Sequence, residues 1–208
     1  MSRFVRRLVG ERAYIKFKPL GHYPDYIWWV LRGKPVRSPH LLKQMTVAEY
    51  GRRYNLRCLV ETGTYYGEMV AALRKQFDLV YSIELDPKLA GYSRQRFKNY
   101  PQVKILEGDS CALLPQVAAQ LDHPAVFWLD AVYYGVDLTK GDLSRLLTEL
   151  RAILSSPVRE HVVLIDDART FVGTDNKFSA SQLVAWIERE YPDRKVEIAR
   201  DIFRVTCR

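Results

Sequence analysis

From residue 58 onward, short apolar runs alternate with longer segments in which apolar residues recur every three or four positions. The short runs predict β-strands, and the longer segments predict amphipathic helices. The clearest helix covers residues 142–154, where leucine and isoleucine share one face. The expected strands cover residues 58–61, 79–85, 103–106, 125–130, 161–167, 195–200 and 202–207.

Helices are also expected over residues 66–76, 87–99, 113–121 and 179–190. Asp86 and Pro87 predict the start of the second of them, because aspartate caps helix N-termini and proline suits the first helical position. Pro115 predicts an irregular start for the third. Residues 40–54, upstream of the first strand, have helical character as well.

This alternation predicts an α/β protein whose doubly wound sheet carries helices on both faces. The last two expected strands, residues 195–200 and 202–207, are separated by a single residue. They must pair antiparallel, because a parallel pair needs a long crossover connection. The fold class is therefore a Rossmann-like, seven-stranded sheet that ends in an antiparallel strand.

The N-terminal part of the chain differs from this pattern. Its apolar residues are interleaved with arginine and lysine, so we expect a basic, aromatic cap over residues 1–50 and the α/β domain over residues 51–208. Residues 26–31 read Tyr-Ile-Trp-Trp-Val-Leu, a dense aromatic patch. Three interpretations stay open for this patch: core where the cap docks on the sheet, contact with a membrane surface or lipid-linked substrate, and a subunit interface in a homodimer.

Charge is concentrated in the same part of the chain. Residues 1–57 hold 13 Lys or Arg against 3 Asp or Glu, a balance of +10, whereas residues 58–208 hold 19 against 21, a balance of −2. Such asymmetry predicts a negatively charged partner or surface. Two kinds of partner satisfy this expectation: a membrane surface, contacted peripherally through residues 1–31, and a substrate that bears phosphate.

Length and composition favour an ordinary globular protein. The chain has 208 residues, 48% of them apolar, which is enough for one domain with a substantial core. No window approaches the roughly 18 consecutive apolar residues of a membrane span. Arginines interrupt the N-terminal apolar residues, unlike a secretory signal, so a cytoplasmic location is expected, with membrane association if the N-terminal segment binds lipid. The three cysteines are far apart and lack metal-ligand spacing, so we expect reduced thiols.

One motif carries most of the functional information. The segment Leu-Val-Glu-Thr-Gly-Thr-Tyr-Tyr-Gly, residues 59–67, is an apolar strand that runs into an acidic residue and two glycines. Glu84 follows Gly63 by 21 positions, the reach expected for a carboxylate on the neighbouring strand that holds a ribose. The order Glu-x-Gly-x-x-x-Gly is not the dinucleotide fingerprint, and Glu61 would repel a pyrophosphate but suits an amino group and a sulfonium. The segment resembles the first motif of class I S-adenosylmethionine-dependent methyltransferases.

The resemblance covers roughly residues 58–207 and implies S-adenosylmethionine as the cofactor and the sheet order 3-2-1-4-5-7-6. Residues on the first strand and its loop would surround the methionine part, the end of the second strand would take the ribose hydroxyls, and the end of the third would lie along the adenine. The residues that the resemblance assigns to cofactor binding are Glu61, Thr62, Gly63, Thr64, Gly67, Glu84, Leu85, Asp109, Ser110 and Asp130.

A second set of carboxylates, Asp130, Asp166 and Asp167, ends two further strands. Clustered carboxylates need a positive partner, so a metal ion, a substrate cation or the sulfonium is expected nearby. The arrangement resembles magnesium-dependent O-methyltransferases, including those that act on macrolide sugars, and so implies that these aspartates bind Mg²⁺. Alternatively, Asp130 contacts the cofactor's amino group while Asp166 or Asp167 caps a turn.

The phrases around Asp130 and Asp166 also resemble small bacterial class I methyltransferases of unsettled substrate. Those proteins carry a histidine where this chain has Val132. Besides Asp130, the catalytic candidates are therefore Tyr133, Tyr134, Asp167 and Arg169, the arginine as an electrostatic partner. Each has an equally good structural interpretation, as packing or as charge neutralisation.

The function expected from these residues is O-methylation of a small-molecule or glycan-type acceptor, phosphate-bearing or lipid-linked. One alternative is a catalytically inactive S-adenosylmethionine-binding or scaffold protein. Another is a nucleic-acid methyltransferase, prompted by the basic N-terminus. The second alternative is disfavoured, because the chain lacks the Asn/Asp-Pro-Pro-aromatic loop and the Pro-Cys nucleophile of base methylases.

Overall fold

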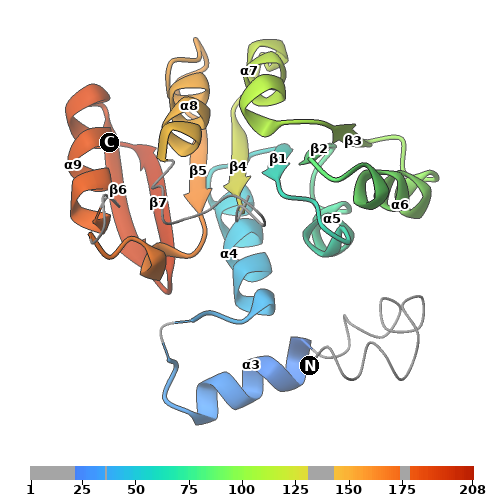
Figure 1. Cartoon of the computed structure of the whole chain (residues 1–208), viewed down its shortest axis with the longest axis horizontal. Helices are drawn as coiled ribbons and strands as arrows, with labels where there is room; N and C mark the ends of the chain where they lie inside the picture. Colours follow the sequence, from blue (N-terminus) through green and yellow to red (C-terminus); the bar gives the residue numbers. More distant parts are fainter. Residues whose placement is uncertain (1–21, 36, 131–142, 174–178) are drawn as a thin grey trace.

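A single seven-stranded sheet forms the centre of the computed structural model, which describes residues 22–35, 37–130, 143–173 and 179–208 (Figure 1). Its order is β3-β2-β1-β4-β5-β7-β6. In chain order the strands are β1 (Cys58–Thr62), β2 (Leu79–Glu84), β3 (Val103–Glu107), β4 (Ala125–Leu129), β5 (Val162–Ile165), β6 (Arg194–Ala199) and β7 (Ile202–Cys207).

Helices cover both faces of the sheet. One apolar cluster joins the sheet to α7, α8 and α9, and the other joins its opposite face to α4, α5 and α6. A further helix, α3, lies apart from the sheet on the side where α4 begins (Figure 1). The helices are α3 (His22–Leu31), α4 (His40–Arg53), α5 (Glu68–Leu73), α6 (Pro87–Phe97), α7 (Ser110–Gln120), α8 (Leu143–Leu154), the short 3-10 helix η3 (Ala168–Thr170) and α9 (Ala180–Glu190).

Strands β1 to β5 pair in parallel, so their carboxyl ends gather along one edge of the sheet. β7 pairs antiparallel with β5 and β6, which confirms the predicted fold class and strand order. The β6–β7 connection is the two-residue turn Arg200-Asp201, in which both residues have positive φ (52° and 65°), as a tight hairpin requires. Because β7 starts opposite the end of β5, this turn lies at the same carboxyl edge.

Capping aspartates set where two of the helices begin, one as expected and one earlier than expected. Asp86 caps α6 as predicted, accepting from the backbone N–H groups of Lys88 and Leu89. The expected irregular start at Pro115 is wrong: α7 already begins at Ser110, because Asp109 caps it. β5 ends at Ile165, so Asp166 and Asp167 lie in the loop that follows it rather than in the strand.

The N-terminal segment is only partly separate from the sheet. α4 packs Val47 and Tyr50 into the core cluster that it shares with α5. The aromatic patch forms the second half of α3, and most of its side chains are exposed. Residues 1–21 lie outside the described part of the chain. No helix among the described residues is long and apolar enough to cross a membrane.

Candidate active site

The loop after β1 owes its shape to unusual backbone conformations. Gly63 and Gly67 have φ of 87° and 71°, in the left-handed region that favours glycine, and Tyr65 adopts φ 50° although it has a side chain. A methyl group on Gly67 would come within 2.5 Å of the Phe97 ring, so the loop also packs tightly against α6. The N–H groups of Gly63 and Thr64 both donate to the Ile83 carbonyl, at 2.9 and 3.3 Å. The loop is thereby fixed against the end of β2.

Glu84, the last residue of β2, faces this loop. One carboxylate oxygen accepts from the Tyr65 N–H at 2.7 Å, and the other accepts from the Asp86 N–H at 2.9 Å. A carboxylate can accept about four hydrogen bonds, so each oxygen keeps one further acceptor site. The next residue, Leu85, is 65% exposed beside it. A pair of hydroxyl groups could bind Glu84 while a flat apolar ring covers Leu85.

Glu61 lies beneath the loop in a buried hydrogen-bond chain. Ser82 donates to Glu61, and the Ser82 and Thr64 hydroxyls are 2.6 Å apart. Burial raises the pKa of Glu61 to about 8, against the hydrogen bond from Ser82, which lowers it. The side chain therefore carries a proton at neutral pH unless a cation binds close to it.

The side chains at the end of β3 are already bonded within the protein. The Asp109 carboxylate accepts from the Cys111 N–H at 2.9 Å and pairs with Arg145 of α8. Ser110 donates to Glu149 of α8 at 2.5 Å. These contacts join α7 to α8, and the expected contact of Asp109 and Ser110 with adenine stays a prediction.

Carboxylates gather at the ends of β4 and β5, around a lysine that belongs to α4. The Lys43 ammonium pairs with Asp166 and lies 3.3 Å from Asp167 Oδ1. The Asp166 side chain is only 1% exposed, and that of Lys43 is 13% exposed. Asp130 lies close enough for its charge to raise the pKa of Lys43. A largely buried ammonium thus joins the carboxylates.

The pKa values show how these charges balance. Burial and the Asp166 charge raise the pKa of Asp130 well above its usual range. Burial also raises the pKa of Asp166, although Lys43 opposes the shift. Burial would raise the pKa of Asp167 too, but hydrogen bonds and charge from Arg169 and Lys43 outweigh it and lower the pKa. Asp167 therefore stays ionised, whereas Asp130 is suited to hold a proton.

Arg169 connects this cluster to the β6–β7 turn. Its guanidinium lies 2.7 Å from Asp167 and also pairs with Asp201. The Asp201 carboxylate accepts a second hydrogen bond, at 2.7 Å, from the backbone N–H of Arg169. The Ser38 hydroxyl, just before α4, donates to the Arg200 carbonyl at 2.7 Å. The turn therefore supports both the arginine and the helix that carries Lys43. Asp167 itself has a positive φ of 57°, a strained conformation that such contacts can hold.

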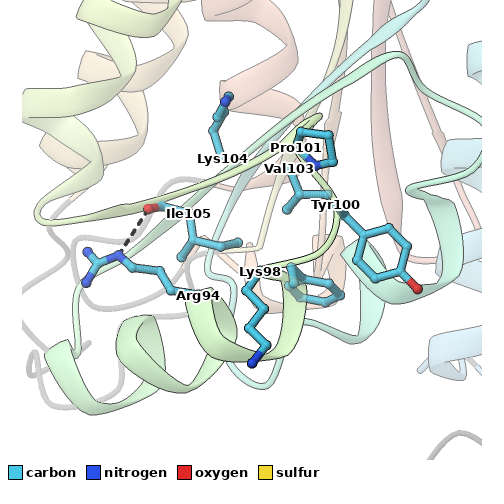
Figure 2. Close-up of a pocket in the computed structure, with 8 residues that line it drawn as sticks. Arg94, Lys98, Tyr100, Pro101, Val103, Lys104 and Ile105 are labelled. Atoms are coloured by element: carbon cyan, nitrogen blue, oxygen red, sulfur yellow. Dashed lines mark hydrogen bonds between the residues drawn. The ribbon is translucent and has the colours of Figure 1, made fainter.

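A separate pocket of about 250 Å³ lies between α6 and the edge strand β3 (Figure 2). Arg94, Lys98 and Lys104 give it a basic lining, and the Arg94 Nε donates to the Ile105 carbonyl at 3.4 Å. The pocket faces the outer edge of the sheet and contains none of the cofactor or carboxylate residues predicted from the sequence. It is therefore not the site built around Glu84 and Lys43.

No protein-family model matches this chain, and no curated protein matches it. Solved structures do. The S-adenosylhomocysteine-bound methyltransferase PaMTH1 of Podospora anserina is similar with a TM-score of 0.59, at 17% identity over 100% of this chain and 97% of that one. A putative caffeoyl-CoA O-methyltransferase from Staphylococcus aureus has a TM-score of 0.60, at 14% identity over 94% of this chain and 100% of that one.

The 23S rRNA methyltransferase ErmE has a TM-score of 0.51, at 21% identity over 79% of this chain and 68% of that one. By name, these three structures are methyltransferases, and the sheet order β3-β2-β1-β4-β5-β7-β6 matches the Rossmann-like methyltransferase fold. This is the class I methyltransferase fold. The resemblance inferred from residues 58–207 is thereby confirmed at the level of the fold.

Within the methyltransferase fold, the predicted residues occupy one edge of the sheet. Glu61, Thr62 and Gly63 end β1 and open its loop, Glu84 ends β2, and Asp130 follows β4. Asp166, Asp167 and Arg169 follow β5. Tyr133 and Tyr134 lie outside the described residues, so their catalytic role stays a prediction.

Lys43 is a site residue that the sequence did not predict. The expected positive partner of the carboxylates was a metal ion, a substrate cation or a sulfonium, whereas the structure places an ammonium from α4 there. No signal in the sequence identified it, because a lysine on an amphipathic helix is usually exposed. Among the described residues, no group of three or more His, Cys, Asp or Glu could hold a metal ion. The aspartates do not fit Mg²⁺ as they stand, since Lys43 already binds Asp166 and Asp167.

Removing the ammonium should destabilise the fold. Lys43→Met keeps most of the apolar stem but leaves Asp166 buried without its cation, so we expect a loss of about 3 kcal/mol in the free energy of unfolding. Urea denaturation at pH 7 measures it. Arg57→Met is the control, because its pair with Asp78 is mostly exposed and should contribute less than about 1 kcal/mol. Equal losses in the two variants would contradict the role given to Lys43.

Proposed function

We propose that this protein is an S-adenosylmethionine-dependent methyltransferase that acts on a hydroxyl group of a small-molecule or glycan-type acceptor. The observation that carries the proposal is the loop after β1, which has three residues with positive φ and donates a backbone N–H to Glu84. A separate carboxylate cluster lies at the same edge of the sheet. Open α/β sheets bind their ligands at this edge. The S-adenosylhomocysteine-bound neighbour supports the choice of cofactor, and the O-methyltransferase neighbour supports oxygen as the acceptor atom.

The cofactor-side residues fit such a nucleoside. Glu84 keeps acceptor sites for the two ribose hydroxyls, and exposed Leu85 offers a surface for the adenine ring. In this proposal Glu61 ionises when the cofactor binds, and its carboxylate stabilises the positive charge of the cofactor's amino group or sulfonium. Thr62, Thr64 and Asp130 would complete the methionine side, and the cofactor supplies an electrophilic methyl group when it is bound.

The acceptor-side residues would position and deprotonate the hydroxyl. Asp130 is the proposed proton acceptor in its ionised form, because burial and the Asp166 charge raise its pKa and so make its carboxylate a stronger base. Lys43 and Arg169 hold Asp167 ionised and in place. Lys43 supplies the positive charge for which Mg²⁺ was expected, so we propose methyl transfer without a divalent ion.

RNA is the second candidate acceptor. The similarity to an rRNA methyltransferase and the balance of +10 over residues 1–57 favour it. Phosphate contacts would make such binding strongly dependent on salt.

Methyl transfer itself is the direct test of the proposed function. The protein is incubated with methyl-labelled S-adenosylmethionine and, in parallel, with hydroxylated glycans, phosphorylated sugars and total RNA, each with and without EDTA. We expect label on an alkali-stable methyl ether of a hydroxylated small molecule, unaffected by EDTA. Label on RNA alone would favour the second candidate, and no transfer to any acceptor despite cofactor binding would favour the scaffold alternative.

Cofactor binding should depend on Glu84. Glu84→Gln places an amide nitrogen against a backbone N–H and removes the charge-assisted bonds to the ribose, which are worth about 1.5–3 kcal/mol. We therefore expect S-adenosylhomocysteine to bind about 10- to 100-fold more weakly in isothermal titration calorimetry. Glu107→Gln is the control, since Glu107 is exposed at the end of the neighbouring strand β3 and pairs with Arg94. A wild-type affinity in Glu84→Gln would refute the assigned ribose site.

The affinity for S-adenosylmethionine should also depend on pH. The pKa of Glu61 is about 8 in the free protein, and a bound cation favours the ionised form, so the affinity should rise with pH from about 6 to 8. The slope should approach tenfold per pH unit. Glu61→Gln should flatten it. Glu149→Gln, at a glutamate whose pKa of about 7 is also raised by burial, should keep the slope. A pH-independent affinity in the wild type would exclude Glu61 from the site.

A further inference from the structure

Helix α3 turns a continuous apolar face toward solvent. Tyr23, Ile27, Val30 and Leu31 are spaced i, i+4, i+7 and i+8, so they share one face of the helix, which Trp28 widens. Ile27, Trp28 and Leu31 are 57%, 61% and 71% exposed. Contiguous exposed apolar surface of this kind marks an interaction site.

The opposite side of α3 packs against the segment that follows the helix. Trp29 is buried, its Nε1 donates to the Pro35 carbonyl at 2.8 Å, and its ring lies 5.9 Å from that of Tyr26. α3 also contacts α4. The helix therefore buries one side and exposes the other, and it lies apart from the sheet (Figure 1).

Positive charge accompanies the exposed face. The Arg32 guanidinium lies over the Trp28 ring, 5.6 Å from its centroid, and Lys34 and Arg37 follow within five residues. The acidic residue of α3, Asp25, precedes Trp29 by four positions and so shares the anchored side. The apolar face thus ends in basic residues, within the quarter of the chain that carries the balance of +10.

We propose that α3 docks this protein on an anionic lipid surface, a property beyond the proposed methyl transfer and independent of it. Ten residues form a helix of about 15 Å, too short to cross a bilayer, so α3 would lie in the plane of the interface. Tryptophan and tyrosine favour that depth, and flanking lysine and arginine bind acidic head groups. A second copy fits the face less well, because both copies carry the same balance of +10 over residues 1–57 and would repel each other.

Co-sedimentation of the full chain with lipid vesicles tests this docking. We expect binding to phosphatidylcholine vesicles that contain about 30% phosphatidylglycerol, weaker by at least about tenfold on pure phosphatidylcholine, because each basic residue near the surface contributes roughly fivefold. Brominated lipids should quench the tryptophan fluorescence of the wild type. Trp28→Phe should lose most of this quenching, since the other three tryptophans, Trp29, Trp128 and Trp186, are buried.

Two double variants separate apolar insertion from charge. Ile27→Gln with Leu31→Gln removes apolar area from exposed positions, and Arg32→Gln with Lys34→Gln removes two positive charges; each should weaken binding about tenfold or more. The matched controls are Ile198→Gln, exposed on β6, and Lys98→Gln with Lys104→Gln at the pocket beside β3. Both controls should bind vesicles like the wild type. All variants should keep the wild-type circular dichroism and affinity for S-adenosylhomocysteine.

Three outcomes would overturn the proposal. The first is the absence of binding to anionic vesicles. The second is binding that the Ile27 and Leu31 substitutions leave unchanged, which would indicate adsorption by charge alone. The third is a wild-type dimer in sedimentation analysis that becomes monomeric in Ile27→Gln with Leu31→Gln, which would assign the face to a second copy. Since cofactor affinity is measured separately, failure of the lipid proposal leaves the proposed methyl transfer untouched.

Discussion

Carboxylates gathered at one edge of a sheet, largely out of water, need a cation, and the ammonium of Lys43 meets that requirement. The contact spans more than 120 residues of chain and ties α4 to the end of β5. The β6–β7 turn reinforces it, because the Arg200 carbonyl accepts a hydrogen bond from Ser38 and Asp201 pairs with Arg169. Helix α4 is therefore part of the candidate active site, not only a cover for it.

The proposed cofactor side depends on the backbone conformation of the loop after β1 and on the protonation of Glu61. The positive φ of Tyr65 in the loop after β1 is an unfavourable backbone conformation by itself. Glu84 stabilises it by accepting a hydrogen bond from the Tyr65 N–H. Glu61 beneath the loop carries a proton that a cationic ligand would displace. In the proposed function, the carboxylates at the ends of β1 and β2 bind a nucleoside with a positive group, while those after β4 and β5 already have a positive partner. Two neighbouring half-sites of this kind suit transfer between a cofactor and an acceptor.

The fold could be predicted from the sequence because each strand is a short apolar run and the last two strands are too close for a parallel crossover. The acidic ends of the strands could be predicted as well, since parallel strands bring them to one edge. Lys43 could not, because its partners are distant in sequence and its helix resembles a surface helix. The start of α7 was misjudged because the capping by Asp109 outweighs the proline inside the helix. Asp109 and Ser110 show a further limit, since sequence could not reveal their bonds to Arg145 and Glu149.

A crystal structure of the protein grown with S-adenosylhomocysteine and Mg²⁺ tests the central claim most directly. We predict density for the nucleoside over Leu85, with both ribose hydroxyls on Glu84, and the Lys43 ammonium still between Asp166 and Asp167. An ion bridging Asp130 and Asp166 with Lys43 displaced, or a nucleoside bound away from Glu84, would contradict this account of the site.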